Sequence, residues 1–248
     1  MEIIRSRKNA QLRYFRELGR DSALRRQEGR YLCDGEKLLR EAVEKGVSIS
    51  GVLLREGGSQ PPLPDVPVYT AGEEAFAYAS PLENSPGPLF IAERRPIPVR
   101  ERPERVVVLE NVQDPGNVGT VLRTAAALGT DAVILVGQCA DPWQSKTVRA
   151  SMGALFRQSL IETDLDGLSA LLRSWELPLW GAALSPEAED IHAVSLRRAA
   201  VAVGNEGRGL TQALLARCTG KLIIPMTPGS ESLNAAVAAS ILMWEMAR

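Results

Sequence analysis

LIIPMTPGSESLNAAVAASILMW, residues 222–244, is the stretch that decides the fold of this chain. Its first three residues are apolar and β-prone, and the prolines and glycine after them forbid regular strand pairing. A Ser- and Asn-rich segment then starts a helix that carries no charge before Glu245. A helix that is apolar all round must be buried on more than one side. The stretch therefore predicts a buried strand, a loop that is either a plain core turn or a ligand-binding loop, and a buried helix.

The composition is that of an ordinary globular protein. The chain has 248 residues, 45% of them hydrophobic and 24% charged, enough for one large domain or two modest ones. It shows no signal-peptide core and no apolar run long enough to span a bilayer, so we expect a cytoplasmic protein without membrane contact. Its cysteines, Cys33, Cys139 and Cys218, are widely spaced, and His192 is its single histidine. This pattern argues against a metal site, a disulfide framework and a histidine-based triad.

Positive charge is concentrated at the start of the chain. Residues 1–30 contain nine Lys or Arg against four Asp or Glu, so they carry +5 while the rest of the chain carries −6. Leu12, Phe15 and Leu18 recur at helical spacing, which predicts a helix around residues 9–18 with one packed side and one basic side. A basic arm on an acidic protein indicates a polyanionic partner such as RNA, and a solvated basic helix is the alternative.

The N-terminal part has the pattern of a small α/β unit. Strands are expected at residues 49–54, 68–69 and 89–92. An amphipathic helix is expected before them, with an apolar face formed by Leu38, Leu39, Ala42 and Val43. Residues 95–104 then combine prolines with arginines, a composition that continues neither a helix nor a sheet. We therefore expect one domain at residues 1–94, a linker at 95–104 and a second domain at 105–248.

In the second domain, short apolar runs alternate with helical patterns. The strands are expected at residues 106–109, 132–136, 179–184, 199–203 and 222–224. Alternation of this kind is typical of a parallel sheet that is covered by helices. The fold class is therefore α/β.

The first of these strands runs into the turn ENVQDPGN, residues 110–117. Asn117 is expected to cap the helix that follows, and the helix then carries a polar stripe of Asn117, Thr120 and Thr124 with Arg123 at its edge. Open α/β sheets bind ligands at the carboxyl ends of their strands, which favours a functional role for this stripe. The alternative for Arg123 is a surface salt bridge.

Two further segments carry unusual patterns. SKTVRASMGA, residues 145–154, combines small residues with two basic ones and is a weak signal by itself. VGNEGRGL, residues 203–210, follows a strand with glycines that let the backbone approach a ligand closely. The glycine spacing differs from the dinucleotide fingerprint, and the chain has no phosphate-binding Gly-Lys-Ser/Thr loop, so a nicotinamide dehydrogenase and a P-loop NTPase are both disfavoured.

Together these segments resemble the three signature motifs of the SpoU/TrmH family of RNA ribose 2′-O-methyltransferases, within the SPOUT superfamily. Motif one is ENVQDPGNVGTVLRTAAALG, motif two is SKTVRASMGAL, and motif three is VGNEGRGL followed by IIPMTPGSESLNAAVAASI. The N-terminal part is similar to the family's small ribosomal-protein-like RNA-binding domain. The chain departs from the family pattern at Ala235 and Ala236, where relatives often have Val-Ser.

The resemblance implies a C-terminal parallel-sheet domain with a trefoil knot, joined to a small N-terminal α/β RNA-binding domain. It implies that the knot loops hold S-adenosylmethionine, with the cofactor contacts falling on Gly204, Ile224, Met226 and Leu233. The family's functional polar residues fall on Asn117, Arg123, Glu206, Ser232 and Asn234. Arg123 is assigned to gripping a substrate phosphate and activating the hydroxyl, Asn117 and Glu206 to orienting Arg123, and Ser232 and Asn234 to shaping the cofactor and ribose pocket.

The expected function is S-adenosylmethionine-dependent 2′-O-methylation of a ribose in RNA, with ribosomal RNA as the first choice. A transfer RNA substrate is one alternative, and a non-catalytic RNA-binding or ribosome-assembly protein is another. The uncharged helix at residues 235–244 predicts a homodimer, in which Arg123 of one subunit could serve the cofactor loop of the other. No metal is expected.

Overall fold

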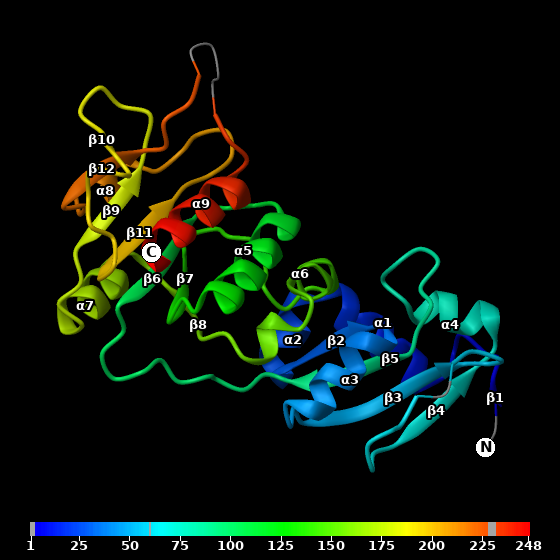
Figure 1. Cartoon of the computed structure of the whole chain (residues 1–248). Coiled ribbons are helices and arrows are strands. Elements are labelled where there is room, and N and C mark those ends of the chain that lie inside the picture. The colour runs from blue at the N-terminus through cyan, green and yellow to red at the C-terminus, as the bar shows by residue number, and fades with distance from the viewer. Residues whose placement is uncertain (1–2, 60, 228–231) are drawn as a thin grey trace. The chain divides into compact units, whose positions relative to one another are not determined.

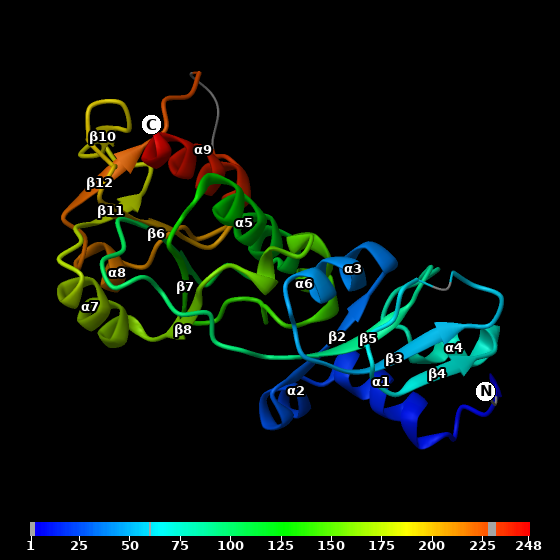
Figure 2. The same ribbon diagram turned by 60° about the horizontal axis from the view of Figure 1, so that its bottom comes forward.

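The computed structural model describes residues 3–59, 61–227 and 232–248. The chain forms two compact units, each coloured along the sequence in Figures 1 and 2. Unit 1 consists of Met1–Arg95 together with Asp141–Phe156, and unit 2 consists of Pro96–Ala140 together with Arg157–Arg248. Residues 228–231, which include part of the Pro/Gly loop discussed above, lie outside the described residues.

Unit 1 contains a mixed sheet flanked by helices. Its strands are β1 (Ile3–Ile4), β2 (Arg30–Asp34), β3 (Ile49–Arg55), β4 (Val68–Ala71) and β5 (Leu89–Glu93), in the order β1-β4-β3-β5-β2. Its helices are α1 (Ala10–Arg20), α2 (Ser22–Glu28), α3 (Glu36–Glu44), α4 (Glu73–Ala79), α6 (Ser145–Ser151) and the 3-10 helix η1 (Ala154–Phe156). The strand pair β3–β4 is parallel, whereas β5 runs antiparallel to both β2 and β3.

The core of unit 1 confirms the helical spacing at the start of the chain. Leu12, Phe15 and Leu18 on α1 are fully buried, and Asn9 caps the helix by accepting hydrogen bonds from the backbone of residues 11 and 12. On α3 the expected face is only partly correct, because Val43 is 46% exposed. It lies in the last turn of a helix that ends at Glu44, beyond the part that packs on the sheet.

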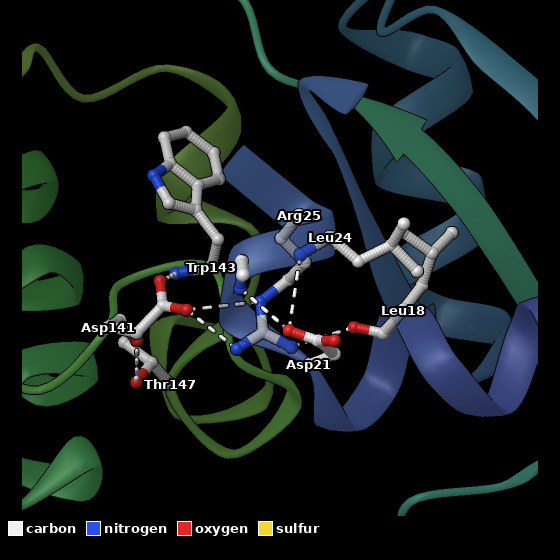
Figure 3. A network of polar contacts seen from close by, with 8 residues as sticks. Leu18, Asp21, Leu24, Arg25, Asp141, Trp143 and Thr147 are labelled. Atoms are coloured by element: carbon white, nitrogen blue, oxygen red, sulfur yellow. Dashed lines mark hydrogen bonds and ion pairs between the residues drawn. The ribbon is translucent and has the colours of Figure 1, made fainter. Parts of the chain in front are cut away.

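Segment 141–156 is held in unit 1 by a buried ion pair. Two guanidinium nitrogens of Arg25 donate to Asp141 Oδ2 at 3.0 and 2.6 Å, and a third donates to the Leu18 carbonyl at 2.7 Å (Figure 3). The Trp143 ring lies 4.9 Å from the Tyr31 ring between centroids. If the segment moved away, Arg25 would be left as a buried charge without a partner, which costs about 3–5 kcal/mol. The ion pair therefore holds the segment in unit 1.

Unit 2 contains a sheet whose described strand pairs are all parallel. Its strands are β6 (Arg105–Glu110), β7 (Ala132–Val136), β8 (Leu160–Thr163), β9 (Leu179–Ala182), β10 (Glu189–Asp190), β11 (Ala199–Val203) and β12 (Gly220–Ile223), in the order β10-β12-β9-β11-β6-β7-β8. Its helices are α5 (Pro115–Leu128), α7 (Leu165–Ser174), α8 (Gln212–Leu215) and α9 (Ala235–Ala247).

Both faces of this sheet are buried. Val106, Ala200 and their same-face neighbours pack against Leu168 of α7 and Leu214 of α8. The alternate residues, such as Val107, point to the opposite face and are equally buried. There α5 and α9 lie side by side, as both views show, and contact β6, β7 and β11. A sheet covered on both sides explains why its strands are continuous apolar runs.

The parallel α/β fold expected from the sequence is confirmed, and the five expected strands correspond to β6, β7, β9, β11 and β12. The domain limits at residues 94 and 105 stay a prediction. Motif two, expected in the second domain, lies in the segment that packs with unit 1. Among the described residues, no helix has the length and apolar character needed to cross a bilayer.

One expected cap is wrong. The N-cap of α5 is Asp114, whose Oδ1 accepts a hydrogen bond from the Asn117 backbone N–H at 3.0 Å. Pro115 occupies the first helical position, where its missing N–H costs nothing, so the helix begins before Asn117. As a consequence, the Asn117 side chain lies in the first turn and is free for other contacts.

Candidate active site

A cavity of about 490 Å³ lies at the carboxyl ends of β9, β11 and β12. The loops that follow β11 and β12 supply most of its wall. The lining residues are Ala182, Ala183, Leu184, Val203, Gly204, Asn205, Glu206, Gly207, Arg208, Gly209, Leu210, Leu215, Leu222, Ile223, Ile224, Met226, Ser232, Leu233, Ala235 and Ala238. The cavity is therefore walled mainly by the two segments of motif three, residues 203–210 and the segment after β12, together with the end of β9.

Gly204 is the point where the loop after β11 closes on itself. A Cβ atom at this position would lie 2.2 Å from the Gly209 carbonyl carbon and 2.3 Å from the Leu210 nitrogen. Both contacts are with backbone, which cannot rotate away as a side chain could. Only glycine therefore fits here without moving the wall of the cavity.

Asn205 gives the loop its shape. Its backbone exchanges two hydrogen bonds with Gly209, at 3.1 and 2.9 Å, which makes a tight hairpin. Its Oδ1 accepts from the backbone N–H groups of Gly207 and Arg208 at 3.0 and 3.1 Å, and its Nδ2 donates to the Asn111 carbonyl at 2.9 Å. The side chain thus folds the hairpin and ties it to the end of β6.

Three of the expected site residues form a continuous polar chain. Asn117 Nδ2 donates to Glu206 Oε1 at 2.9 Å, and Asn234 Nδ2 donates to Asn117 Oδ1 at 3.0 Å. Asn234 also caps α9, because its Oδ1 accepts from the backbone of residues 236 and 237. This hydrogen-bonded chain of side chains therefore connects α5, the loop after β11 and the start of α9.

The Glu206 carboxylate is held in its deprotonated form. Burial is the largest single influence and raises its pKa, but the hydrogen bond from Asn117 and those from backbone N–H groups together outweigh burial. The backbone groups of Gln113 and Asp114 donate at 3.4 and 3.3 Å. The net result is a lowered pKa, so the carboxylate presents a negative charge at neutral pH.

The structure places all four expected cofactor residues together. Gly204, Ile224, Met226 and Leu233 all line the cavity, as do Glu206 and Ser232. Asn117 lies next to it through its hydrogen bond to Glu206, and Asn234 through its hydrogen bond to Asn117. The assignment of roles to these residues stays a prediction.

Arg123 stands apart from this group. It is exposed on α5, and among residues 3–59, 61–227 and 232–248 it has neither a hydrogen bond nor an ion pair. Asn117 and Glu206 bond to each other instead. Their expected role of orienting Arg123 therefore remains a hypothesis.

Sequence reasoning missed part of the wall. Ala182 ends β9, and Ala183 and Leu184 follow it; the rule that ligands bind at the carboxyl ends of parallel strands could have found them. The contact of Asn205 with Asn111 could not have been found, since these residues are 94 positions apart and no local pattern links them.

The cysteines of unit 2 are poor nucleophiles. Burial, and then the charge of Glu110, raises the pKa of the Cys218 thiol to about 11. Burial likewise raises the pKa of Cys139. Because the thiolate is the reactive form, both side chains stay unreactive at neutral pH. No cluster of three metal-binding side chains occurs in the part of the chain that the structure describes.

The model of the SpoU rRNA methylase family matches residues 104–244, which is more than half of the chain. The chain belongs to this family. The match spans all three motifs and confirms the resemblance that they carry.

Other members resemble the chain over nearly its whole length. It is 30% identical over 248 residues to the 23S rRNA (guanosine(2553)-2′-O)-methyltransferase RlmP of Bacillus subtilis, and the alignment covers 99% of each chain. A structure of an AdoMet-bound rRNA methyltransferase from Sinorhizobium meliloti has a TM-score of 0.86 at 25% identity and covers 99% of this chain and 97% of that one. A structure of an RNA 2′-O ribose methyltransferase has a TM-score of 0.83 at 27% identity and covers 99% and 98%. The similarity to the two solved structures thus extends over nearly the whole of this SpoU-family chain.

Proposed function

We propose that this protein transfers a methyl group from S-adenosylmethionine to a ribose 2′-hydroxyl of RNA, and that its substrate is ribosomal RNA. The observation that carries the proposal is the polar chain Glu206–Asn117–Asn234 beside the glycine-walled cavity, in a member of the SpoU family. The compared proteins support it, because two are named as rRNA methyltransferases and one of these has AdoMet bound.

The cavity suits S-adenosylmethionine in size and chemistry. Its volume lies within the range of small-molecule sites, about 300–1,000 Å³. Ile224, Met226 and Leu233 offer an apolar surface for the adenine ring. Glu206 and Arg208 supply both signs of charge, as a ligand with cationic groups and a carboxylate requires.

Bound S-adenosylmethionine supplies a methyl group on a sulfonium. The chain's own residues must hold the ribose oxygen in line with that group and provide a route for the hydroxyl proton. An arginine side chain stays protonated in proteins, so we assign Arg123 to gripping a substrate phosphate with its guanidinium fork and to activating the ribose hydroxyl together with that phosphate. We assign Asn117 and Glu206 to orienting Arg123, and Ser232 and Asn234 to shaping the cofactor and ribose pocket.

We also propose that the C-terminal segment of unit 2 is threaded into a trefoil knot. Two observations support this proposal. The strand β12 lies on the far side of β9 from the centre of the sheet, yet α9, which comes after β12 in the chain, packs on α5, with Ser240 Oγ 3.3 Å from Thr124 Oγ1. The chain also belongs to the SpoU family. The small mixed sheet of unit 1 with its basic helix α1 supports assigning residues 1–94 to an RNA-binding domain, residues 95–104 to a linker and residues 105–248 to the catalytic domain.

One experiment tests the function and the choice of RNA. The full-length protein is incubated with methyl-labelled S-adenosylmethionine and with unmodified ribosomal RNA or transfer RNA, and the alkali-resistant linkages are then mapped. We expect label at a ribose of ribosomal RNA. Label found only in transfer RNA would show that transfer RNA, and not ribosomal RNA, is the substrate. Cofactor binding without label in either RNA would favour a non-catalytic RNA-binding protein.

Replacing Arg13 and Arg20 on α1 together by Glu is expected to weaken RNA binding and its dependence on salt. Both side chains are exposed, and neither forms an ion pair in the described part of the chain. Each lost phosphate contact should reduce the slope of log affinity against log salt by about 0.7–0.9. Filter binding over a range of about 50–200 mM salt measures both quantities.

The control for this variant is Arg173→Glu on α7, an exposed arginine of unit 2. It should leave the slope unchanged, and all variants should bind S-adenosylmethionine normally. Substitution is preferable to deleting residues 1–94, because that deletion would strip Asp141 and Trp143 of their partners Arg25 and Tyr31. An unaltered slope in the double variant would remove α1 from the RNA-binding surface.

Trp244→Glu is expected to convert a homodimer into a monomer. Trp244 and Val237 are 60% and 48% exposed on α9, beside an apolar hollow that Thr120 of α5 also lines. A charge in the centre of a self-complementary apolar contact would be buried without a partner. Sedimentation velocity measures the change, with Val43→Glu at an exposed apolar position of unit 1 as the control. A wild-type protein that sediments as a monomer would refute the dimer.

A further inference from the structure

Glu110 is a buried carboxylate at the end of the central strand β6. It is 2% exposed, and its side chain lies on the sheet face that α7 and α8 cover, where Val106 and Val108 of the same strand are apolar core residues. Burying a carboxyl group here is costly unless it is hydrogen-bonded. The residue therefore needs a reason other than packing.

Both oxygens of Glu110 are bonded to a single residue. Thr211 donates its backbone N–H to Oε2 at 2.7 Å and its hydroxyl to Oε1 at 2.6 Å. Thr211 follows directly on the loop of residues 204–210 that walls the cavity, and it also caps α8 by accepting from the Leu214 backbone N–H. The carboxylate thus fastens the far end of the cavity loop to β6.

The first residues of the same loop are bonded to Asn111, the residue that follows Glu110. Asn205 Nδ2 donates to the carbonyl of Asn111 at 2.9 Å, and Asn111 has a positive φ of 55°. Positive φ is uncommon outside glycine and is tolerated best by Asn and Asp. Residues 110 and 111 therefore hold the loop at both of its ends, and between those ends lies Glu206 with its bond to Asn117.

We propose that Glu110 is a positioning residue, which holds the loop of residues 204–210 in the shape that binds S-adenosylmethionine and presents Glu206 to Asn117. The inference rests on the proposed function. Glu110 acts through Thr211 and touches no substrate. Without its acceptor oxygens, the two donors of Thr211 lose their bonds and the loop loses one of its two anchors to β6.

Three variants differ in how many of the two hydrogen bonds between Thr211 and residue 110 they keep. Thr211→Ser keeps both donors and should behave as the wild type. Glu110→Gln keeps one acceptor and should weaken S-adenosylmethionine binding about tenfold, and Glu110→Leu keeps none and should weaken it about 100-fold, as unmade buried hydrogen bonds do. Calorimetry well below the unfolding temperature measures affinity. Steady-state kinetics should show a raised KM for the cofactor and an unchanged KM for RNA.

The outcomes separate this inference from simpler ones. If Glu110→Gln melts at a lower temperature but binds the cofactor as the wild type does, Glu110 serves stability alone and the proposal is overturned. If the KM for S-adenosylmethionine and the KM for RNA change together, Glu110 does not act through the loop of residues 204–210, and the proposal is overturned. If Glu110→Leu fails to fold, the comparison of Glu110→Gln with Thr211→Ser still decides. A wild-type protein that does not bind S-adenosylmethionine would overturn the proposed function instead.

Discussion

Gly204→Val is expected to abolish S-adenosylmethionine binding while the two units remain folded. The new Cβ would lie 2.2–2.4 Å from the backbone of Gly209 and Leu210, closer than non-bonded atoms approach. The strand β11 before Gly204 is fully embedded in the sheet, whereas residues 205–209 form a surface hairpin, so the hairpin must move. Because the hairpin is one wall of the cavity, its displacement should cost more than about 100-fold in affinity, equivalent to about 3 kcal/mol.

Calorimetry tests this loss, and circular dichroism with thermal melting shows whether the protein is folded. Gly204→Ala adds only the Cβ and should already lose most of the affinity, because the clash is with that atom. Gly51→Ala is the matched control: its nearest neighbour would lie 3.7 Å away, an ordinary contact, and it is in unit 1. Normal cofactor binding by Gly204→Val would show that the cavity lies elsewhere.

The sheet of unit 2 could be predicted because its central strands are buried on both faces. The run AVILV at β7 and the run AAVAV at β11 match the observed strands residue for residue. The edge strands β8 and β10 were not predicted. The four residues of β8 are only half-buried or exposed and include polar ones, and β10 is a two-residue exposed strand, so neither leaves an apolar signal.

The place of motif two could not be predicted from local pattern. The strand signals on both sides of it, at β7 and beyond, suggest that it continues the second domain. What places it in unit 1 is the ion pair of Asp141 with Arg25, 116 residues earlier in the chain. A contact of such long range has no local sequence signature.

The sequence motifs predict which residues form the site, but not which hydrogen bonds join them. Asn117, Glu206 and Asn234 were each expected to be functional, and the structure joins them in one chain. Local reasoning put the helix start at Asn117, but Asp114 and Pro115 start α5 earlier. That shift lets the Asn117 amide bond to Glu206 and Asn234 in place of capping its own helix.

Arg123→Ala is expected to lower kcat about 10²–10³-fold with S-adenosylmethionine affinity unchanged, since a group that steadies charge at the reacting centre typically contributes that much. Arg123 is exposed and has no partner within the described residues, so its removal should change the free energy of unfolding by less than about 0.5 kcal/mol. A large kinetic loss would therefore report on its contact with the substrate and not on folding.

Arg123→Lys separates charge from geometry. A lysine keeps the positive charge but not the planar fork that grips phosphate through two bonds, so it should restore only part of kcat. Arg173→Ala, at another exposed helical arginine of unit 2, is the matched control and should leave kcat unchanged. Single-turnover methylation at saturating cofactor measures the chemical step for all variants. Full activity of Arg123→Ala, or a parallel loss of cofactor binding, would remove Arg123 from the phosphate-gripping role.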